Sequence, residues 1–329
     1  MNQLTCYIVG AGFMGGVHME CYTKLSGIKV LGIVDNNKER GIAFADKHKI
    51  RWNATLEDAF AIEKADFCDV CLPSYVHKDA VIKAFALGAD VICEKPFAVS
   101  LEDVDQMIAA STQYGKRLMI AHVCRFMPQY YVLKDILESK SLGRPITFET
   151  TRESETPAWT FNNWLKDKSK SGGTLLDLSI HDIDVSNWLF GIPNYHHLEL
   201  SQIDNRPGAD YIVSTLGYGS GVSVNITANH LLPKAHPFFT AFRLVCEKGC
   251  VEYNSEYDPE NLVIFKDNEC EKINLSCKDG FKDSYLYELE VFTNCLRSGS
   301  DFPISLKEAR VAVETVIKLY AECHKSIVE

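Results

Sequence analysis

The feature that most constrains the fold is a regular alternation of apolar runs and amphipathic segments over the first 122 residues. Five apolar runs have the length and composition of buried strands: Leu4–Val9, Lys29–Asp35, Asp66–Leu72, Asp90–Cys93 and Leu118–His122. Between them, apolar residues recur at the three- and four-residue spacing of helices packed on a sheet, in Met14–Leu25, Lys38–His48, Leu56–Ile62, Lys78–Leu87 and Leu101–Tyr114. This repetition predicts a parallel, doubly wound sheet.

The alternation ends near residue 123, and a different pattern follows. A helix is expected at Pro128–Leu137 and a strand at Ile146–Arg152, whereas Thr156–Gly173 is polar and predicted to be rich in loops. Successive β-rich runs then predict a large, mainly antiparallel, open-faced sheet: Tyr211–Tyr218, Val222–Asn229, Ala241–Cys246 and Leu262–Lys266.

Two amphipathic helices are expected to close the chain. They cover Tyr285–Arg297 and Leu306–His324, and the second follows Ser305, a suitable N-cap with Glu308 three residues on. At 329 residues the chain is longer than most single cores. We therefore predict an α/β fold of two domains, a sheet domain of residues 1–123 and an α+β domain of residues 124–329.

Charge and hydropathy limit the partners. The formal net charge is −10, and no run of Lys or Arg is dense enough to neutralise a nucleic-acid backbone, so nucleic acid is not expected as a partner. No apolar run approaches the roughly 18 to 20 residues that a membrane span needs. The N-terminus shows no basic segment or cleavage site of a secretory signal, so we expect a cytoplasmic protein with no membrane partner.

The twelve cysteines are spread over the chain, mostly inside apolar runs, which favours buried thiols over a disulfide framework. Cys68 and Cys71 form a Cys-x-x-Cys spacing. Because that segment is predicted to be a buried strand, whose side chains alternate between faces, the two thiols should point apart. No redox or metal site is expected here.

A glycine-rich turn follows the first predicted strand and opens the first predicted helix. In Gly10-Ala11-Gly12-Phe13-Met14-Gly15, the first glycine permits a tight turn, the second lets the backbone approach a pyrophosphate, and the third allows close packing of helix on strand. The helix N-terminus favours the anion. The pattern predicts a dinucleotide site at these residues, with Phe13 and Met14 at the turn.

An acidic residue, Asp35, ends the second predicted strand 20 residues beyond Gly15. It would accept hydrogen bonds from the adenosine ribose hydroxyls and would repel a 2′-phosphate, which favours NAD over NADP. Lys38 and Arg40 lie close enough in the sequence to keep the use of NADP open.

Two further segments follow strands at the carboxyl edge of the sheet, where doubly wound folds bind ligands. The first contains Pro73 and His77, and we expect it to border the nicotinamide half of the cofactor; a capping role for His77 at its helix start is equally open. The second is Glu94-Lys95-Pro96, whose Glu94 and Lys95 are assigned to the cofactor site.

With this Glu-Lys-Pro segment behind a glycine-rich turn, the chain resembles the glucose–fructose oxidoreductase, inositol dehydrogenase and rhizopine catabolism (Gfo/Idh/MocA) family over essentially its whole length. A second segment, Gly172-Gly173-Thr174-Leu175-Leu176-Asp177-Leu178-Ser179-Ile180-His181-Asp182, is similar to the family's inositol dehydrogenase branch. The resemblance implies a Rossmann domain, a catalytic and substrate-binding Lys95, a cis peptide before Pro96, and catalytic roles for Asp177 and His181.

The physical chemistry of the second segment agrees with these roles. Four residues separate Asp177 from His181, so on a helix they share a face, where the carboxylate can orient the imidazole and raise its basicity. His181 would then serve as general base and contact the substrate. The alternative, that Asp177 and Ser179 cap a helix over Ile180–Phe190, can hold at the same time.

Arg125 and Trp164 complete the expected substrate-binding set. Cys124 departs from the family pattern, in which Asn or Arg commonly stands at that position. Asp184 is expected to be a solvated or capping carboxylate rather than a ligand of the substrate.

Together these features predict an NAD(P)-dependent oxidoreductase that acts on CH–OH groups, oxidising a secondary hydroxyl of a sugar, sugar derivative or inositol-like polyol. Lys95 would stabilise the alkoxide that develops as His181 removes the proton. Two alternatives stay open: an NAD-dependent glycosidase that works through transient oxidation, and a non-catalytic ligand-sensing protein on the same fold. An apolar sheet face also predicts a homodimer or homotetramer.

Overall fold

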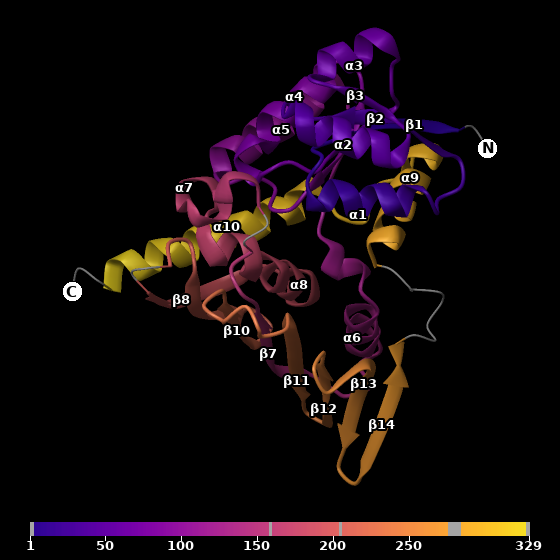
Figure 1. Ribbon diagram of the computed structural model, residues 1–329. Coiled ribbons are helices and arrows are strands. Elements are labelled where there is room, and N and C mark those ends of the chain that lie inside the picture. The colour runs from indigo at the N-terminus through magenta and orange to yellow at the C-terminus, as the bar shows by residue number, and fades with distance from the viewer. Residues whose placement is uncertain (1–2, 158–159, 204–205, 276–283, 327–329) are drawn as a thin grey trace. The chain divides into compact units, whose positions relative to one another are not determined.

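The structure is a computed structural model that describes residues 3–157, 160–203, 206–275 and 284–326. The chain forms two compact units (Figure 1). The first unit comprises Met1–Val123, Thr160–Asn162 and Tyr285–Arg310, and the second comprises Cys124–Trp159, Asn163–Ser284 and Val311–Glu329. Each unit is built around its own sheet.

The first unit contains a parallel six-stranded sheet with the strand order β3-β2-β1-β4-β5-β6. Its strands are β1 Leu4–Val9, β2 Ile28–Val34, β3 Arg51–Asn53, β4 Phe67–Val70, β5 Asp90–Glu94 and β6 Leu118–Ala121. The order reverses between β1 and β4, which confirms the predicted doubly wound topology. The three-residue edge strand β3 was not predicted, because its sequence Arg-Trp-Asn carries no apolar run.

Five helices connect these strands, α1 Phe13–Tyr22, α2 Lys38–His48, α3 Leu56–Ile62, α4 His77–Ala86 and α5 Leu101–Tyr114, and Figure 1 shows α4 and α5 side by side. Three of them begin at side chains that accept a backbone N–H. Asn37 caps α2, Thr55 caps α3 and Ser100 caps α5, which explains where these helices start.

Helix α9, Ser284–Ser298, belongs to the first unit from Tyr285 onward, although the predicted boundaries assign it to the second domain. Buried Phe292 of α9 packs edge-on against Phe67 of β4, with ring centroids 5.3 Å apart. Arg117, just before β6, donates a hydrogen bond of 2.8 Å to the carbonyl of Cys295. These contacts join residues far apart in the sequence, and no local pattern announces them.

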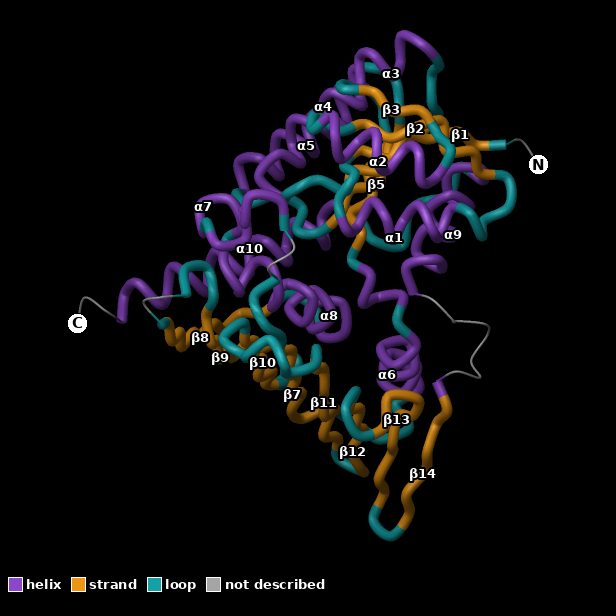
Figure 2. Tube along the Cα trace, in the orientation of Figure 1, coloured by secondary structure: helices purple, strands orange, loops and turns teal. Residues whose placement is uncertain are grey.

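The second unit contains an eight-stranded sheet with the order β14-β13-β12-β11-β7-β10-β9-β8 (Figure 2). Its strands are β7 Pro145–Glu153, β8 Pro193–Gln202, β9 Asp210–Tyr218, β10 Ser223–Asn229, β11 Phe239–Cys246, β12 Gly249–Asn254, β13 Asp258–Lys266 and β14 Glu269–Asn274. Only the β7–β10 pair is parallel among these described strands, so the prediction of a mainly antiparallel sheet is confirmed.

One face of this sheet carries helix α8, Ile180–Phe190. Along β7 the buried side chains alternate, and Phe148, Thr150 and Arg152 all point to the face that α8 covers. Phe148 packs against Phe190 at the end of α8, with ring centroids 5.7 Å apart. Helix α8 therefore packs against this face of the sheet, which fixes its position.

Three further helices are described in part or in full: α6 Pro128–Ser139, the short α7 Lys168–Ser171, and α10 Leu306–Ser326. At the start of α10, Ser305 Oγ accepts the N–H of Glu308 while the Glu308 carboxylate accepts the N–H of Ser305, which confirms the predicted N-cap. Within the described ranges, no helix has the length and apolar character needed to cross a bilayer.

Candidate active site

The glycine-rich turn has the steric properties of a dinucleotide site. Gly10 has φ of +111°, and a Cβ there would lie 2.6 Å from the carbonyl oxygen of Cys71. A Cβ on Gly15 would lie 2.0 Å from the carbonyl oxygen of Gly10. The space around Gly12 is open, since a Cβ there would meet no atom within 4 Å, and within the described part of the chain no side chain caps α1. A pyrophosphate fits this uncapped helix start.

Asp35 lies at the carboxyl end of β2, as predicted, and its side chain is buried. Its carboxylate accepts hydrogen bonds from the N–H groups of Ala11 and Asn37, at 2.8 Å each, and binds the Arg40 guanidinium at 2.7 and 2.9 Å. Binding of the ribose stays a prediction. In this structure the oxygens that would accept the ribose hydroxyls already accept protein hydrogen bonds.

His77 is buried at the start of α4 and joins the loops after β4 and β5. Its Nδ1 lies 3.0 Å from the carbonyl oxygen of Pro96, and its Nε2 lies 2.8 Å from that of Leu72. Burial lowers the pKa of His77 below its usual value, and the two carbonyl acceptors partly oppose this shift. His77 makes no side-chain cap at α4; its contact with the cofactor, and that of Pro73, stay predictions.

The Glu94-Lys95-Pro96 segment directly follows β5, and the peptide before Pro96 is cis, as the family resemblance implied. The Glu94 carboxylate turns inward, where Oε2 accepts the N–H of Lys95 at 3.1 Å and Oε1 lies 3.2 Å from Nε2 of His18. The Lys95 backbone is thus held at the sheet edge by its own neighbour. The role of Glu94 in cofactor binding stays a prediction.

Beneath this loop lies a buried polar cluster that the sequence did not reveal. His18 of α1 donates from Nδ1 to Asp69 of β4 at 2.8 Å, and Tyr22 donates to the same oxygen at 2.9 Å. The Cys71 thiol lies 3.4 Å from both Asp69 Oδ1 and His18 Nδ1. These donor atoms are close enough to bind a metal ion, but here they satisfy one another by hydrogen bonds, and no ion is needed to explain their burial.

In the second unit, Gly172 and Gly173 both have positive φ, 71° and 67°, and lead into a helical segment. The segment Leu175–Ser179, η4, is a π-helix that continues directly into α8. The expected capping of α8 by Asp177 and Ser179 is wrong, because Ser179 has helical backbone angles and makes no cap hydrogen bond. The helix begins earlier, where Asp210 accepts the N–H of Thr174 at 3.4 Å.

Asp177 and His181 lie four residues apart across the junction of the π-helix and α8, and both are partly exposed. Such π-helical turns are frequent at functional sites. His181 Nδ1 lies 3.6 Å from the Cys124 sulfur. Asp177 Oδ2 lies 3.4 Å from Nε2 of His230, a residue directly after β10. Two groups that the sequence did not connect with the site, Cys124 and His230, therefore flank the predicted catalytic residues.

The next residue, Asp182, is buried and binds Arg152 of β7. The Arg152 guanidinium donates to the two carboxylate oxygens at 2.8 and 3.1 Å, and the Thr150 hydroxyl donates at 2.7 Å. Arg152 also reaches the Tyr130 hydroxyl at 3.1 Å, and burial raises the pKa of Tyr130 well above its usual value. This charged pair fixes the first turn of α8, which carries His181, to the sheet.

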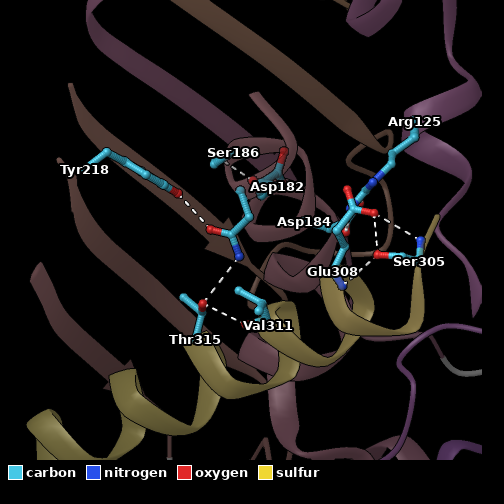
Figure 3. A network of polar contacts seen from close by, with 10 residues as sticks. Arg125, Asp182, Asp184, Ser186, Tyr218, Ser305, Glu308, Val311 and Thr315 are labelled. Carbon is cyan, nitrogen blue, oxygen red and sulfur yellow. Dashed lines mark hydrogen bonds and ion pairs between the residues drawn. The ribbon is translucent and has the colours of Figure 1, made fainter. Parts of the chain in front are cut away.

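Arg125, predicted to contact the substrate, forms a buried bidentate pair with Asp184 at 2.7 and 2.8 Å (Figure 3). The expectation that Asp184 is a solvated or capping carboxylate is wrong, since its side chain is fully buried in this pair. A substrate contact of Arg125 stays a prediction, and in this structure its guanidinium binds Asp184. Trp164, in the 3₁₀ segment Phe161–Lys166, is half-buried, and its substrate contact also stays a prediction.

Figure 3 also shows how α8 is tied on its other side. The Tyr218 hydroxyl of β9 donates to Asn187 Oδ1 at 3.0 Å, and the Asn187 amide donates to the Thr315 hydroxyl at 3.3 Å. The Ser186 hydroxyl donates to the carbonyl of Asp182 at 2.7 Å. Polar contacts to strands and to α10 thus leave the helix that carries His181 little freedom to rotate.

Two segments of the chain match known protein families. Residues 4–122 match the family described as "Oxidoreductase family, NAD-binding Rossmann fold", and residues 130–252 match the "GFO/IDH/MocA C-terminal domain". The chain belongs to the GFO/IDH/MocA family. The resemblance seen in the sequence motifs is thereby confirmed, as is the prediction of an NAD-binding Rossmann domain.

Relatives within the GFO/IDH/MocA family differ in how much of the chain they match. The uncharacterized oxidoreductase YrbE of Bacillus subtilis (strain 168) is 28% identical over 192 residues, which are 58% of this chain and about half, 54%, of that protein. The scyllo-inositol 2-dehydrogenase (NAD⁺) of the same organism is 23% identical over 325 residues, which are 96% of this chain and 93% of that protein.

Among solved structures, an oxidoreductase from Agrobacterium radiobacter in complex with NAD⁺, L-tartaric acid and magnesium superposes with a TM-score of 0.84. It is 19% identical in sequence, and the match covers 99% of this chain and 97% of that one. At this identity the likeness establishes the fold alone.

Proposed function

We propose that the protein is an NAD-dependent dehydrogenase that oxidises a secondary hydroxyl of a sugar, sugar derivative or cyclic polyol. The observation that carries the proposal is the joint presence of two chemical elements of the GFO/IDH/MocA family. The Rossmann unit bears Lys95 at the carboxyl end of β5, and the second unit bears Asp177 and His181 four residues apart on one helical segment. A ligand-sensing protein would need no such base.

NAD bound at the glycine-rich turn would supply the acceptor for the hydride. The residues of the chain supply the proton chemistry. His181 takes the proton of the substrate hydroxyl, Asp177 orients and stabilises the imidazolium that forms, and the Lys95 ammonium stabilises the developing alkoxide. NADP is an alternative cofactor if Arg40 leaves Asp35 to bind the 2′-phosphate.

The substrate class rests on similarity to enzymes with polyol and sugar substrates. The chain is 23% identical to the scyllo-inositol 2-dehydrogenase of B. subtilis and 24% identical, over 257 residues, to a D-apiose dehydrogenase of Paraburkholderia graminis. One name gives an inositol as the compound that is oxidised, and the other gives a sugar. We therefore propose that the physiological substrate belongs to this class. Assembly as a homodimer or homotetramer and a cytoplasmic location stay predictions.

The test is a screen for NADH absorbance with purified protein, NAD, and a panel of inositols, aldoses including D-apiose, and sugar acids. Net NADH formation with one of these compounds is expected. Glycosides are assayed in parallel for release of the aglycone, because a glycosidase that recycles its cofactor cleaves them without net NADH. Aglycone release with no oxidation of any free polyol or sugar would replace the proposed dehydrogenase by that alternative.

The roles of the residues are tested on the best substrate of the panel. Lys95→Met and His181→Asn should each lower kcat by about 10²- to 10⁴-fold, the range of general acid–base assistance, while the Kd for NAD changes little. His197→Asn, the same kind of change at an exposed position of β8, serves as control. Equal losses in turnover and NAD affinity would contradict the assigned roles.

A further inference from the structure

A histidine that belongs to neither of the two motifs named in the sequence analysis lies against the predicted catalytic carboxylate. His230 directly follows β10 and is buried, with only 4% of its surface exposed. Its Nε2 lies 3.4 Å from Asp177 Oδ2. This distance is that of an ion pair, although the two atoms do not have the alignment of a direct hydrogen bond, and Nε2 has no hydrogen-bond partner among the described residues. A buried polar atom without a hydrogen bond requires an explanation.

The position of His230 is fixed by its backbone and by its other ring nitrogen. Its N–H donates to the carbonyl of Asp210 at 3.0 Å, and its carbonyl accepts from the Thr156 hydroxyl at 2.9 Å. Its Nδ1 lies 3.0 Å from Ser154 Oγ. The ring therefore has little freedom to turn away from Asp177. The short distance between His230 and Asp177 follows from contacts that fix His230 at the end of β10.

The contacts of Ser154 bear on where the ring carries its hydrogens. A serine hydroxyl has one hydrogen, and Ser154 Oγ lies 2.9 Å from the carbonyl oxygen of Glu155 and 3.0 Å from His230 Nδ1. If the hydroxyl donates to Glu155, its oxygen accepts from a protonated Nδ1; if it donates to Nδ1, the ring hydrogen lies on Nε2. A hydrogen on Nε2 makes the contact with the carboxylate attractive, whereas a neutral ring protonated on Nδ1 alone would direct a lone pair at the carboxylate oxygen, which is repulsive.

We propose that His230 is a positioning residue that holds Asp177 through a hydrogen on Nε2 of the imidazole, which faces Oδ2 of the carboxylate. The inference rests on the proposed function, because it acts through Asp177. Anchoring Oδ2 fixes the direction of the second carboxylate oxygen, which then presents a constant geometry to His181 or to a substrate hydroxyl.

The proton is tested without any substrate by ¹⁵N NMR of protein labelled at histidine, with the His230 signals assigned by their loss in His230→Phe. A ring that carries a proton on Nε2, alone or together with Nδ1, is expected. A neutral ring protonated only on Nδ1 would overturn the proposal, because Nε2 would then direct a lone pair at the carboxylate.

The positioning role is tested by a double-mutant cycle with the best substrate from the panel. His230→Phe should lower kcat/KM by about ten- to a hundredfold, the cost of a lost hydrogen bond to a charged group, and leave the KM for NAD within about twofold. His230→Gln, which keeps a donor, should recover part of the loss. In an Asp177→Asn background, His230→Phe should have almost no further effect.

These experiments distinguish a failure of the catalytic role of Asp177 from a failure of the positioning role of His230. Full activity of Asp177→Asn would reject the proposed catalytic role of Asp177. A large loss in Asp177→Asn with none in His230→Phe, or the same loss from His230→Phe in both backgrounds, would reject the positioning role alone. His197→Phe, the same substitution at an exposed position of the same sheet, is the matched control, and thermal unfolding of each variant verifies that it is folded.

Discussion

The two units bury charge in different ways. In the first unit the buried cation is His18, held between Asp69 at 2.8 Å and Glu94 at 3.2 Å. In the second unit the buried cations beneath the predicted catalytic helix are arginines, Arg152 on Asp182 and Arg125 on Asp184. Both arrangements hold carboxylates away from water, but only the imidazole can lose its charge at moderate pH.

This difference sets how each unit responds to pH. Burial alone would lower the pKa of His18, but the adjacent Asp69 carboxylate outweighs burial and raises that pKa well above its usual value. The pKa of Arg152 is likewise raised against burial, by Asp182, so the guanidinium stays charged at every accessible pH. The second unit should therefore keep its charge network where the first begins to lose it.

The largest expected effect follows from breaking the arginine pair. Arg152→Met leaves the Asp182 carboxylate buried with the Thr150 hydroxyl as its one remaining side-chain donor among the described residues, and should lower the free energy of unfolding by about 3–5 kcal/mol. The measurement is urea unfolding. The double variant Arg152→Met/Asp182→Leu removes both charges and should recover most of the loss; a single variant as stable as the wild type would show that the pair does not hold α8.

The next effect concerns His18. His18→Gln should cost about 1–3 kcal/mol near neutral pH, because Asp69 loses a charged donor and Glu94 loses its ion-pair partner. The contribution of His18 is complete below the unfolded-state pKa of about 6.5 and declines as pH rises through the higher folded-state value. Urea unfolding at about pH 6 and about pH 9 should thus show a smaller gap between wild type and variant at the higher pH. A gap that widens with pH would refute the assigned charge.

The third effect concerns the ion pair of Arg40 and Asp35 in the first unit. Asp35→Ala should raise the KM for NAD by about ten- to a hundredfold and release Arg40 for a 2′-phosphate, so that preference moves toward NADP. Arg40→Ala should move it in the opposite direction. Initial rates with both cofactors provide the measurement, and Lys64→Ala, at an exposed position of the same unit, serves as the control; equal changes for NAD and NADP in Asp35→Ala would argue against ribose recognition.

The smallest effect is expected at an exposed pair. Arg243 contacts Glu252 at 2.6 Å on the second sheet, with roughly half of its side chain exposed. Arg243→Gln should change the free energy of unfolding by only about 0.2–1 kcal/mol and less at high salt. Urea unfolding at low and high ionic strength measures this change. A loss comparable to that of Arg152→Met would mean that burial does not distinguish the two kinds of pair.

Much of the fold could be predicted from local patterns. Apolar runs and helical spacing located the strands and helices of the first sheet, because both faces of that sheet are buried. The assignment of α9 to the first unit could not be predicted in this way, since it depends on Phe292 meeting Phe67, more than two hundred residues away in the sequence.

The candidate site, too, could be predicted only in part from local patterns. Motifs indicated Lys95, Asp177 and His181 as candidates, but the groups that lie beside Asp177 and His181 come from distant segments, His230 after β10 and Cys124 after β6. Arg152 did leave a signal, because it continues the inward alternation of Phe148 and Thr150 along β7, where a charge demands a buried partner. For His230 and Cys124 the signal was weaker: His230 directly follows a predicted strand and Cys124 lies two residues beyond another, in places where side chains often serve a site.

The π-helical segment Leu175–Ser179 holds one more residue per turn than regular winding allows. Deleting a single residue there would restore an α-helix and rotate everything before or after it by about 100°. Asp177 would then no longer face the end of β10. During evolution, substitutions in this segment should therefore be tolerated far more readily than insertions or deletions.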